Sequence, residues 1–225
     1  MEAPLLLALD TSGRSGGIAL ARYDGEFAVV CGEAEIGGGT FSAELIPQIA
    51  SLLQHTQVRL KDVSAIACIT GPGSFTGLRI GLAAVKGLCE THPVPVVPIT
   101  MLELLAASVD ADMVTTVLDA GRREIYVGEY RLREELPIFV SESLQPLERT
   151  DFKGLVITPD AAVARVLKAV EVPRPRPTDL AIYAVKKLAR SAIITADALD
   201  AHYIRRSDAE IFSKPLFHTA DRQET

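Results

Sequence analysis

The chain lacks any long hydrophobic run in its 225 residues. Its first apolar stretch, Leu5 to Leu9, is ended by Asp10, and Glu2 stands where a signal peptide needs a positive charge. We therefore expect a cytoplasmic protein that makes no membrane contact. The 48% share of hydrophobic residues is still enough to build a packed core, in one large domain or in two small lobes.

Cysteine and histidine are too scattered to predict a metal centre. The three cysteines form no C-x-x-C pair, and we expect all of them to be reduced and structural: Cys31, Cys68 and Cys89. None of the four histidines lies three or four residues from another, so no H-x-x-x-H pair can form on one helix face. The sequence predicts no bound metal.

Basic residues are also too few for direct nucleic-acid binding. The 29 acidic residues outnumber the 23 lysines and arginines, and the formal net charge is −6. A chain with this charge repels a phosphate backbone rather than attracting it. If the protein serves RNA chemistry, we expect a partner to hold the RNA.

The most informative segment, GPGSFTGLRIG from Gly71 to Gly81, joins an apolar stretch to a helical one. Its pattern predicts a strand, a tight loop and a helix. A Leu-Arg pair follows Gly77 where a Walker loop needs Lys-Ser/Thr, and Thr76 stands where the dinucleotide pattern needs glycine. Two interpretations stay open: an anion held at the start of the helix, or a flat glycine face that another helix approaches.

Periodicity predicts two similar α/β units. The order βββαβαβα is complete by about residue 108, with Pro47 making the first helix start late or kink. VTTVLDAGRREIYVGEY then repeats the plan of LLLALDTSGRSGGIALARY, so that Leu9-Asp10 corresponds to Leu118-Asp119. We expect lobes over residues 1–109 and 110–225. The second is predicted to contain a helix over 161–170, an extended connector over 172–177, a final helix capped by Thr178, and a tail from residue 200.

The quoted segments resemble the TsaB (YeaZ) family of bacterial tRNA threonylcarbamoyladenosine biosynthesis proteins, relatives of TsaD and of the glycoprotease-like (M22) proteins. The resemblance is carried by LALDTS, GPGSFTGLRIGLAAVKGL, LDAGRREIY and YIRRSDAE, in this order over nearly the whole chain. It implies two tandem RNase H-like (actin-like, ASKHA) α/β lobes with mixed sheets.

The resemblance also implies a function in tRNA processing. It implies a non-catalytic subunit that pairs with and activates a TsaD-like protein in threonylcarbamoyl transfer to adenosine 37 of tRNA (t6A). A TsaE-like ATPase would join the larger complex, tRNA would be met only through that complex, and the chain alone would be a homodimer. The second interpretation is a nucleotide-dependent phosphotransferase of the sugar-kinase-like superfamily.

Two turns match the phosphate-facing turns of the actin-like superfamily. The resemblance implies this role for Asp10, Thr11 and Ser12 in the first lobe and for Asp119 in the second. The alternative interpretation is that both aspartates only stabilise their turns by accepting backbone N–H bonds. Pro159 stands where the superfamily commonly has the glycine of its adenine wall. We therefore expect no cofactor.

Catalytic residues are not predicted. The chain has no G-x-S-x-G elbow, and Ser74 is explained as a helix N-cap. Relatives often have histidine at the position of Phe41, so no proton transfer is expected there. A metal-free peptidase would need a triad that the sequence does not suggest. We expect no enzyme activity from the chain alone.

The resemblance places the partner surface on the helix after Thr40 and the helix that begins at Ser74. Gly77, Gly81 and Ala84 share one helix face, and small residues let a second helix come close. The predicted interface residues are Phe41, Leu45, Ser74, Phe75, Thr76, Gly77, Leu78, Gly81 and Ala84. The predicted tail-docking residues are Tyr203, Arg205, Asp208 and Glu210.

Overall fold

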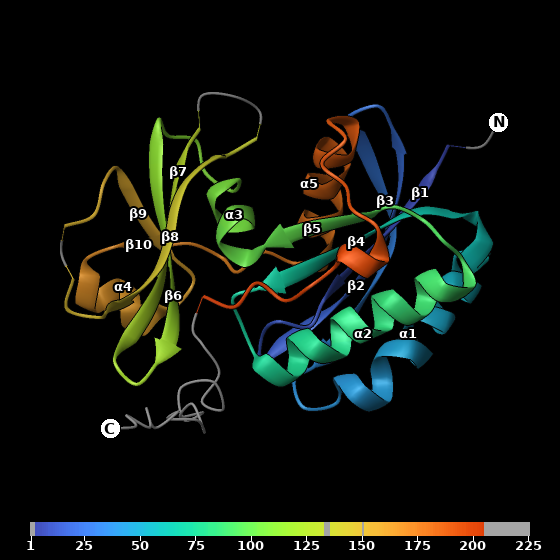
Figure 1. Ribbon diagram of the computed structural model, residues 1–225, viewed down its shortest axis with the longest axis horizontal. Helices are drawn as coiled ribbons and strands as arrows, with labels where there is room; N and C mark the ends of the chain where they lie inside the picture. The colour runs from blue at the N-terminus through green and yellow to red at the C-terminus, as the bar shows by residue number, and fades with distance from the viewer. Residues whose placement is uncertain (1–2, 133–135, 150, 205–225) are drawn as a thin grey trace, which may run out of the picture.

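The computed structural model describes residues 3–132, 136–149 and 151–204, which form two α/β lobes side by side (Figure 1). Each lobe is built around a mixed sheet of five strands. The first sheet has the order β3-β2-β1-β4-β5. Its strands are β1 (Leu5–Asp10), β2 (Ser15–Asp24), β3 (Phe27–Gly37), β4 (Val63–Gly71) and β5 (Val96–Thr100).

The second sheet repeats the first, with the order β8-β7-β6-β9-β10 when read in the same direction. Its strands are β6 (Met113–Gly121), β7 (Glu124–Arg131), β8 (Ile138–Pro146), β9 (Leu155–Thr158) and β10 (Val170–Glu171). In both sheets the first three strands form an antiparallel meander, and the last two run parallel to the first strand. The predicted fold of two tandem RNase H-like lobes with mixed sheets is confirmed.

Helices lie on both faces of the sheets and between the lobes (Figure 1). They are α1 (Phe41–His55), α2 (Phe75–Thr91), α3 (Met101–Ala106), α4 (Ala161–Leu167) and α5 (Pro177–Ala189), with short 3₁₀ turns at Leu60–Asp62 and Ala196–Ala198. In the part of the chain that is described, no helix has both the length and the apolar character that crossing a bilayer requires.

The central strand β1 is buried on both faces, which its apolar sequence allows. Successive side chains of a strand point to opposite faces. Leu5, Leu7 and Leu9 pack in one core with residues of α1 and α2, whereas Leu6 and Ala8 pack in another with residues of α5. The first sheet is therefore covered by α1 and α2 on one side and by α5 on the other.

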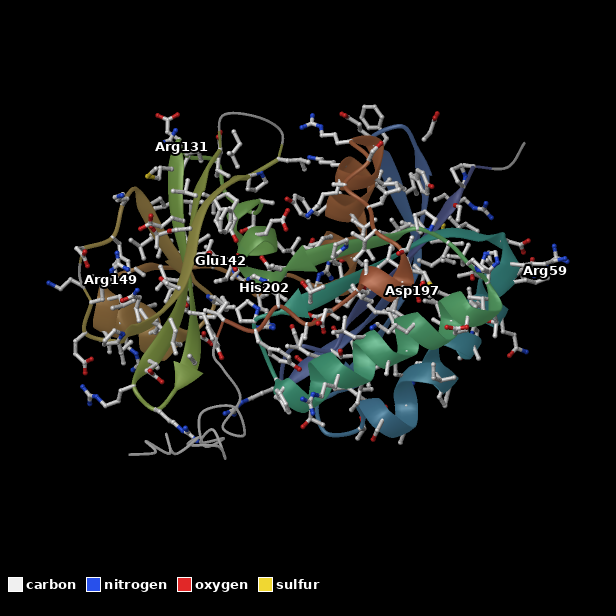
Figure 2. The ribbon with its side chains drawn as sticks, viewed as in Figure 1. Arg59, Arg131, Glu142, Arg149, Asp197 and His202 are labelled. Carbon is white, nitrogen blue, oxygen red and sulfur yellow. The ribbon has the colours of Figure 1, made fainter. Side chains whose placement is uncertain are left out.

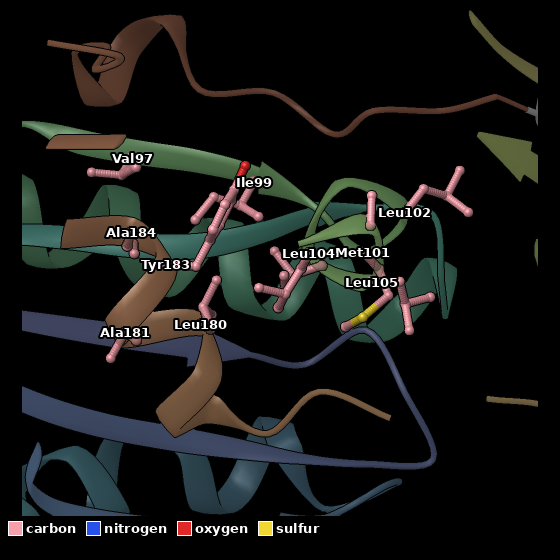
Figure 3. Close-up of a cluster of buried hydrophobic side chains, with 14 of the residues drawn as sticks. Val97, Ile99, Met101, Leu102, Leu104, Leu105, Leu180, Ala181, Tyr183 and Ala184 are labelled. Carbon is pink, nitrogen blue, oxygen red and sulfur yellow. The ribbon is translucent and has the colours of Figure 1, made fainter. Parts of the chain in front are cut away.

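The last helix of each repeat packs across the lobe boundary. α3 follows β5 but also packs on β6 and β7, and α5 follows β10 but packs on β1, β2 and β3. Figure 3 shows apolar residues of the two helices in one cluster. Glu103 of α3 accepts hydrogen bonds from the Tyr183 hydroxyl (2.8 Å) and from Lys187 Nζ (2.7 Å) of α5. The division at residue 109 stays a prediction, and the structure adds that α5, from the second half of the chain, packs on the first sheet.

Three local predictions differ from the structure. α1 begins at Phe41 and includes Pro47, so of the two predicted alternatives the late start is wrong, and the kink stays a prediction. α4 ends at Leu167, because Lys168 adopts a left-handed conformation (φ 54°) and the chain continues into β10. Thr178 does not cap α5: Pro177 is its first residue, and the carboxylate of Asp179 accepts the Arg176 backbone N–H at 2.8 Å.

The segment after α5 returns along the first lobe. Ile194 exchanges backbone hydrogen bonds with Val96 of β5, at 2.9 and 2.8 Å. Leu199 is buried in the core beneath α2, and the His202 backbone N–H donates to the Thr70 carbonyl at 2.9 Å. This segment, residues 192–204, ends between the two lobes, where Figure 2 labels His202.

Candidate functional site

A cavity of about 690 Å³ lies between the lobes, at the ends of β1 and β6. It is lined by residues of both repeats and of the connector before α5: Ser12, Gly13, Arg14, Gly38, Gly39, Pro72, Gly73, Ser74, Leu118, Asp119, Ala120, Tyr126, Asp160 and Arg174. Of the predicted phosphate-facing residues, Ser12 and Asp119 line this cavity. Asp10 borders a smaller one of about 110 Å³.

The turn after β1 is held by its own side chains. One carboxylate oxygen of Asp10 accepts the Ser12 backbone N–H at 2.8 Å and the Ser12 hydroxyl at 2.6 Å. The Thr11 hydroxyl donates to the Gly77 carbonyl of α2 at 2.7 Å. All three side chains are almost fully buried, so this turn is part of the packing between β1 and α2.

The turn after β6 has the same kind of bond. Asp119 Oδ1 accepts the Gly121 backbone N–H at 2.8 Å, and Asp160 Oδ2 accepts the Asp119 backbone N–H at 2.8 Å. Both first-strand aspartates thus accept an N–H from the residue two positions later, which is how aspartate stabilises a turn. These bonds fit the turn-stabilising interpretation of Asp10 and Asp119.

Arg174 brings a positive charge to the turn after β1. Its Nη2 donates to the Ser12 hydroxyl at 3.0 Å, and its Nε is buried without a hydrogen-bond partner among the described residues. The guanidinium lies over Gly13, where an added Cβ would be 3.1 Å from Nε. Among the described residues, Arg174 thus brings a positive charge and a buried N–H without a partner to the wall of this cavity.

The two buried cysteines have thiols with raised pKa values. Burial raises the pKa of the Cys68 thiol to about 12 and also raises the pKa of Cys89. A thiol with a raised pKa is a poor nucleophile. Within the same described ranges, no three His, Cys, Asp or Glu side chains come together as metal ligands would.

The structure places five of the predicted interface residues inside the first lobe: Phe41, Leu45, Gly77, Leu78 and Gly81. An added Cβ on Gly77 would lie 2.0 Å from the Thr11 carbonyl oxygen, and one on Gly81 would lie 2.3 Å from Thr11 Oγ1. The small face of α2 is therefore filled by the chain's own turn after β1. That these glycines receive a partner helix stays a prediction.

Other residues of α1 and α2 face outward. Ser74, Phe75 and Thr76 are exposed at the start of α2, and Ala84 is partly exposed further along. Ile46 of α1, which we did not predict, leaves 53% of its surface exposed. Consecutive residues of a helix point in different directions. The position of Ile46 directly after the buried Leu45 is therefore the sequence signal that could have indicated its exposure. With Ala43, Pro47, Ala50 and Ala83, these residues form the outer face of α1 and α2.

The tail lies against the start of α2. The rings of Phe75 and Tyr203 have centroids 5.4 Å apart, and the Arg79 guanidinium lies 3.7 Å from the centre of the Phe75 ring. Arg79 Nε donates to the Tyr203 hydroxyl at 3.2 Å. We call these three side chains the aromatic platform. The other predicted docking residues, Arg205, Asp208 and Glu210, lie outside the described residues.

A buried carboxylate joins the tail to the second lobe. Glu142 of β8, with 6% of its side chain exposed, lies 2.5 Å from His202 Nε2 and accepts the Tyr130 hydroxyl at 2.5 Å. The Thr100 hydroxyl donates to the same carboxylate at 3.2 Å. Figure 2 shows Glu142 and His202 facing each other between the lobes. Sequence reasoning missed this pair, whose members are separated by 60 positions.

The pair shifts the pKa of both partners. Burial alone would raise the pKa of Glu142, but hydrogen bonds from His202 and Tyr130 outweigh it, so the pKa of the carboxyl is lowered. The bond to Glu142 outweighs burial at His202 and raises the pKa of the imidazole. Burial raises the pKa of Tyr130 strongly, so its hydroxyl stays protonated as a donor.

Comparison with known proteins agrees with this two-lobed actin-like architecture. The family model for TsaD, tRNA N6-adenosine threonylcarbamoyltransferase, matches residues 35–211. The protein named tRNA threonylcarbamoyladenosine biosynthesis protein TsaB of Bacillus subtilis is 28% identical, over 91% of this chain and 96% of its own. Its namesake from Escherichia coli is 27% identical over the same shares. The solved structure of YeaZ from Pseudomonas aeruginosa is 27% identical with a TM-score of 0.74, covering 89% of this chain and 99% of that one.

The fold and the interlobe cleft thus define a member of the two-lobed actin-like proteins with a mixed sheet in each lobe. Since the match covers most of the chain, the protein belongs to the TsaD family, on the TsaB/YeaZ branch that these relatives represent.

Gly81→Leu tests the packing of α2 on β1. A leucine here would displace Thr11, so we expect it to lower the free energy of unfolding by roughly 1 to 3 kcal/mol or more. Thermal unfolding measures the effect, with Gly87→Leu as the matched control because nothing lies within 4 Å of a Cβ on Gly87. Equal unfolding temperatures for the two variants would contradict this account.

The pH dependence of stability in the variant His202→Gln tests the interaction between His202 and Glu142. The imidazole pKa is raised above 6.5 in the folded protein, so its stabilisation is fully present below that pH and is lost as pH rises through the raised value. The pKa of Glu142 is lowered, so the stabilisation from its carboxylate is fully present above pH 4.5 and is lost as pH falls through the lowered pKa. We expect the unfolding temperature of the variant to lie a few degrees below wild type near about pH 6, and the gap to close in alkaline buffer. A gap that grows with rising pH would contradict the assignment.

Proposed function

We propose that the chain is the non-catalytic partner of a TsaD-like protein in threonylcarbamoyl transfer to adenosine 37 of tRNA. The observation that carries the proposal is the outer face of α1 and α2, with Ile46 53% exposed and Phe75 42% exposed on helices whose other sides are packed in the lobe. Family membership supplies the reaction, since relatives over most of the chain are named for it.

The interlobe cleft supports a non-catalytic role. The carboxylates of Asp10 and Asp119 each accept a backbone N–H within their own turns. The turn between β9 and α4 closes on itself, because the Asp160 backbone N–H bonds to Thr158 Oγ1 at 3.2 Å. In this proposal the TsaD-like subunit carries out the chemistry, and a TsaE-like ATPase joins the same complex.

The net charge of −6 fits a subunit that meets tRNA only through its complex. The outer face of α1 and α2 is the surface that we assign to the heterodimer. In the absence of the TsaD-like protein, the same face would bind a second copy of the chain, because an exposed apolar face is driven toward burial. Homodimer and heterodimer would then compete for it.

Ile46→Glu tests this surface. A charge in the centre of an apolar contact leaves an uncompensated buried carboxylate, so we expect affinity for the TsaD-like protein to fall at least about tenfold. Self-association should weaken as well, while thermal unfolding stays unchanged because Ile46 is exposed. Titration calorimetry and light scattering measure the two effects.

The matched control is Val166→Glu, on α4 of the second lobe, where the valine is 57% exposed. It adds the same charge to a helix outside the proposed surface and should leave both associations unchanged. Normal binding of Ile46→Glu to the TsaD-like protein would place the interface elsewhere.

The isolated chain should not turn over ATP. This outcome separates the proposal from the sugar-kinase-like interpretation, which needs a nucleotide in the cleft. Release of inorganic phosphate from ATP is measured with and without the TsaD-like protein, and Asp10→Ala serves as the matched variant. Steady turnover by the isolated chain that is lost in Asp10→Ala would favour the phosphotransferase instead.

A further inference from the structure

The residues around Glu142 come from four separate parts of the chain. Glu142 lies on β8 and Tyr130 on β7, both in the second sheet, whereas Thr100 ends β5 of the first sheet and His202 belongs to the tail. The carboxylate therefore receives donors from both lobes at once. Among these donors, His202 carries the only side chain that is close to half exposed (47%).

The segment of residues 192–204, which contains the start of the tail, is otherwise a part of the first lobe. Ile194 bonds to β5, Leu199 is buried in the core under α2, and the His202 backbone bonds to Thr70 of β4. Its side chain reaches the other way, to Glu142 of the second sheet. The contact between Glu142 and His202 thus ties a segment anchored on the first sheet to the edge strand of the second.

The next residue carries the effect of this contact to α2. Tyr203 packs against Phe75 with its ring tilted and accepts a hydrogen bond from Arg79, so a single peptide bond separates His202 from the aromatic platform. Phe75 and Tyr203 remain 42% and 43% exposed, which leaves the platform open to another molecule. The platform lies at the start of the helix to which we assign the partner.

We propose that the contact between Glu142 and His202 is a latch, which holds the two lobes in one arrangement and sets the aromatic platform for binding the TsaD-like partner. The part of this inference that concerns the partner rests on the proposed function, and the part that concerns the lobes does not. The latch makes the relative position of the lobes a condition for tight binding at α2, because a displaced second lobe would draw His202 and Tyr203 with it or release them.

The experiment uses Glu142→Gln and His202→Gln, singly and together, in the full chain. Glu148→Gln is the control, because Glu148 is also on the second lobe and pairs with an arginine, but at an exposed site. Spin labels on Gln54 of α1 and Val166 of α4, both exposed, report the distance between the lobes. The exposed Cys31 is replaced by serine in this background, since Cys68 and Cys89 are buried.

We expect the interlobe distance distribution to broaden in both latch variants and to stay narrow in Glu148→Gln. Affinity of the unlabelled variants for the TsaD-like protein should fall roughly three- to tenfold, and the double variant should equal the single ones, because the two residues form one unit. Unchanged distances in both variants would overturn the latch. Changed distances with unchanged affinity would overturn its link to the platform.

A failure of the proposed function gives a different result. If the wild-type chain does not bind the TsaD-like protein, the proposed function and the partner role of the platform fall together, whereas the distance measurement still decides on the latch.

Discussion

The close approach of α2 to the turn after β1 is the contact on which the rest of the first lobe depends. Gly77 and Gly81 bring the helix so near that the Thr11 side chain lies against it, and the Thr11 hydroxyl donates to the helix at 2.7 Å. The same turn receives the Ser74 backbone N–H at 2.7 Å, through the carbonyl of Ser12. Burial of α2 on this side forces its other side outward, and α1 packs beside it. The packing of α2 on the turn after β1 and the exposure of its outer face therefore both depend on Gly77 and Gly81.

The same contact determines what the interlobe cleft can do. Because Asp10, Thr11 and Ser12 are engaged in packing and in their own turn, they are fixed rather than free to surround a ligand. Arg174 completes the turn from the connector side. The cleft lies between the lobes, and the polar side chains of the turn after β1 are hydrogen-bonded within the structure. The surface that the packing of the first lobe leaves open on these helices is the outer face of α1 and α2.

Much of the fold could be predicted from the sequence because its signals are local. The apolar run of β1, the glycine loop before α2 and the repeated Leu-Asp ends of β1 and β6 each identify their element within a few residues. The destination of α5 could not be predicted, because an apolar helix face indicates burial but not which sheet buries it. The packing of Thr11 against the glycine face of α2 could not be predicted for the same reason: spacing shows that Gly77 and Gly81 share a face, not what lies against it. The contact between Glu142 and His202 could not be predicted either, because the two residues are 60 positions apart and no local sequence pattern indicates it.

The exchange of α3 and α5 between the lobes has a consequence for synthesis on the ribosome. The face of β1 that carries Leu6 and Ala8 is covered by α5, whose residues are made only after the whole second sheet. A nascent chain that ends before residue 177 therefore holds an uncovered apolar surface on its first sheet. Domains generally fold as units in the order of their synthesis, and exposed apolar surface promotes aggregation. In this protein the first lobe is the last to be completed, because the whole second sheet is synthesised before the helix that covers the first sheet.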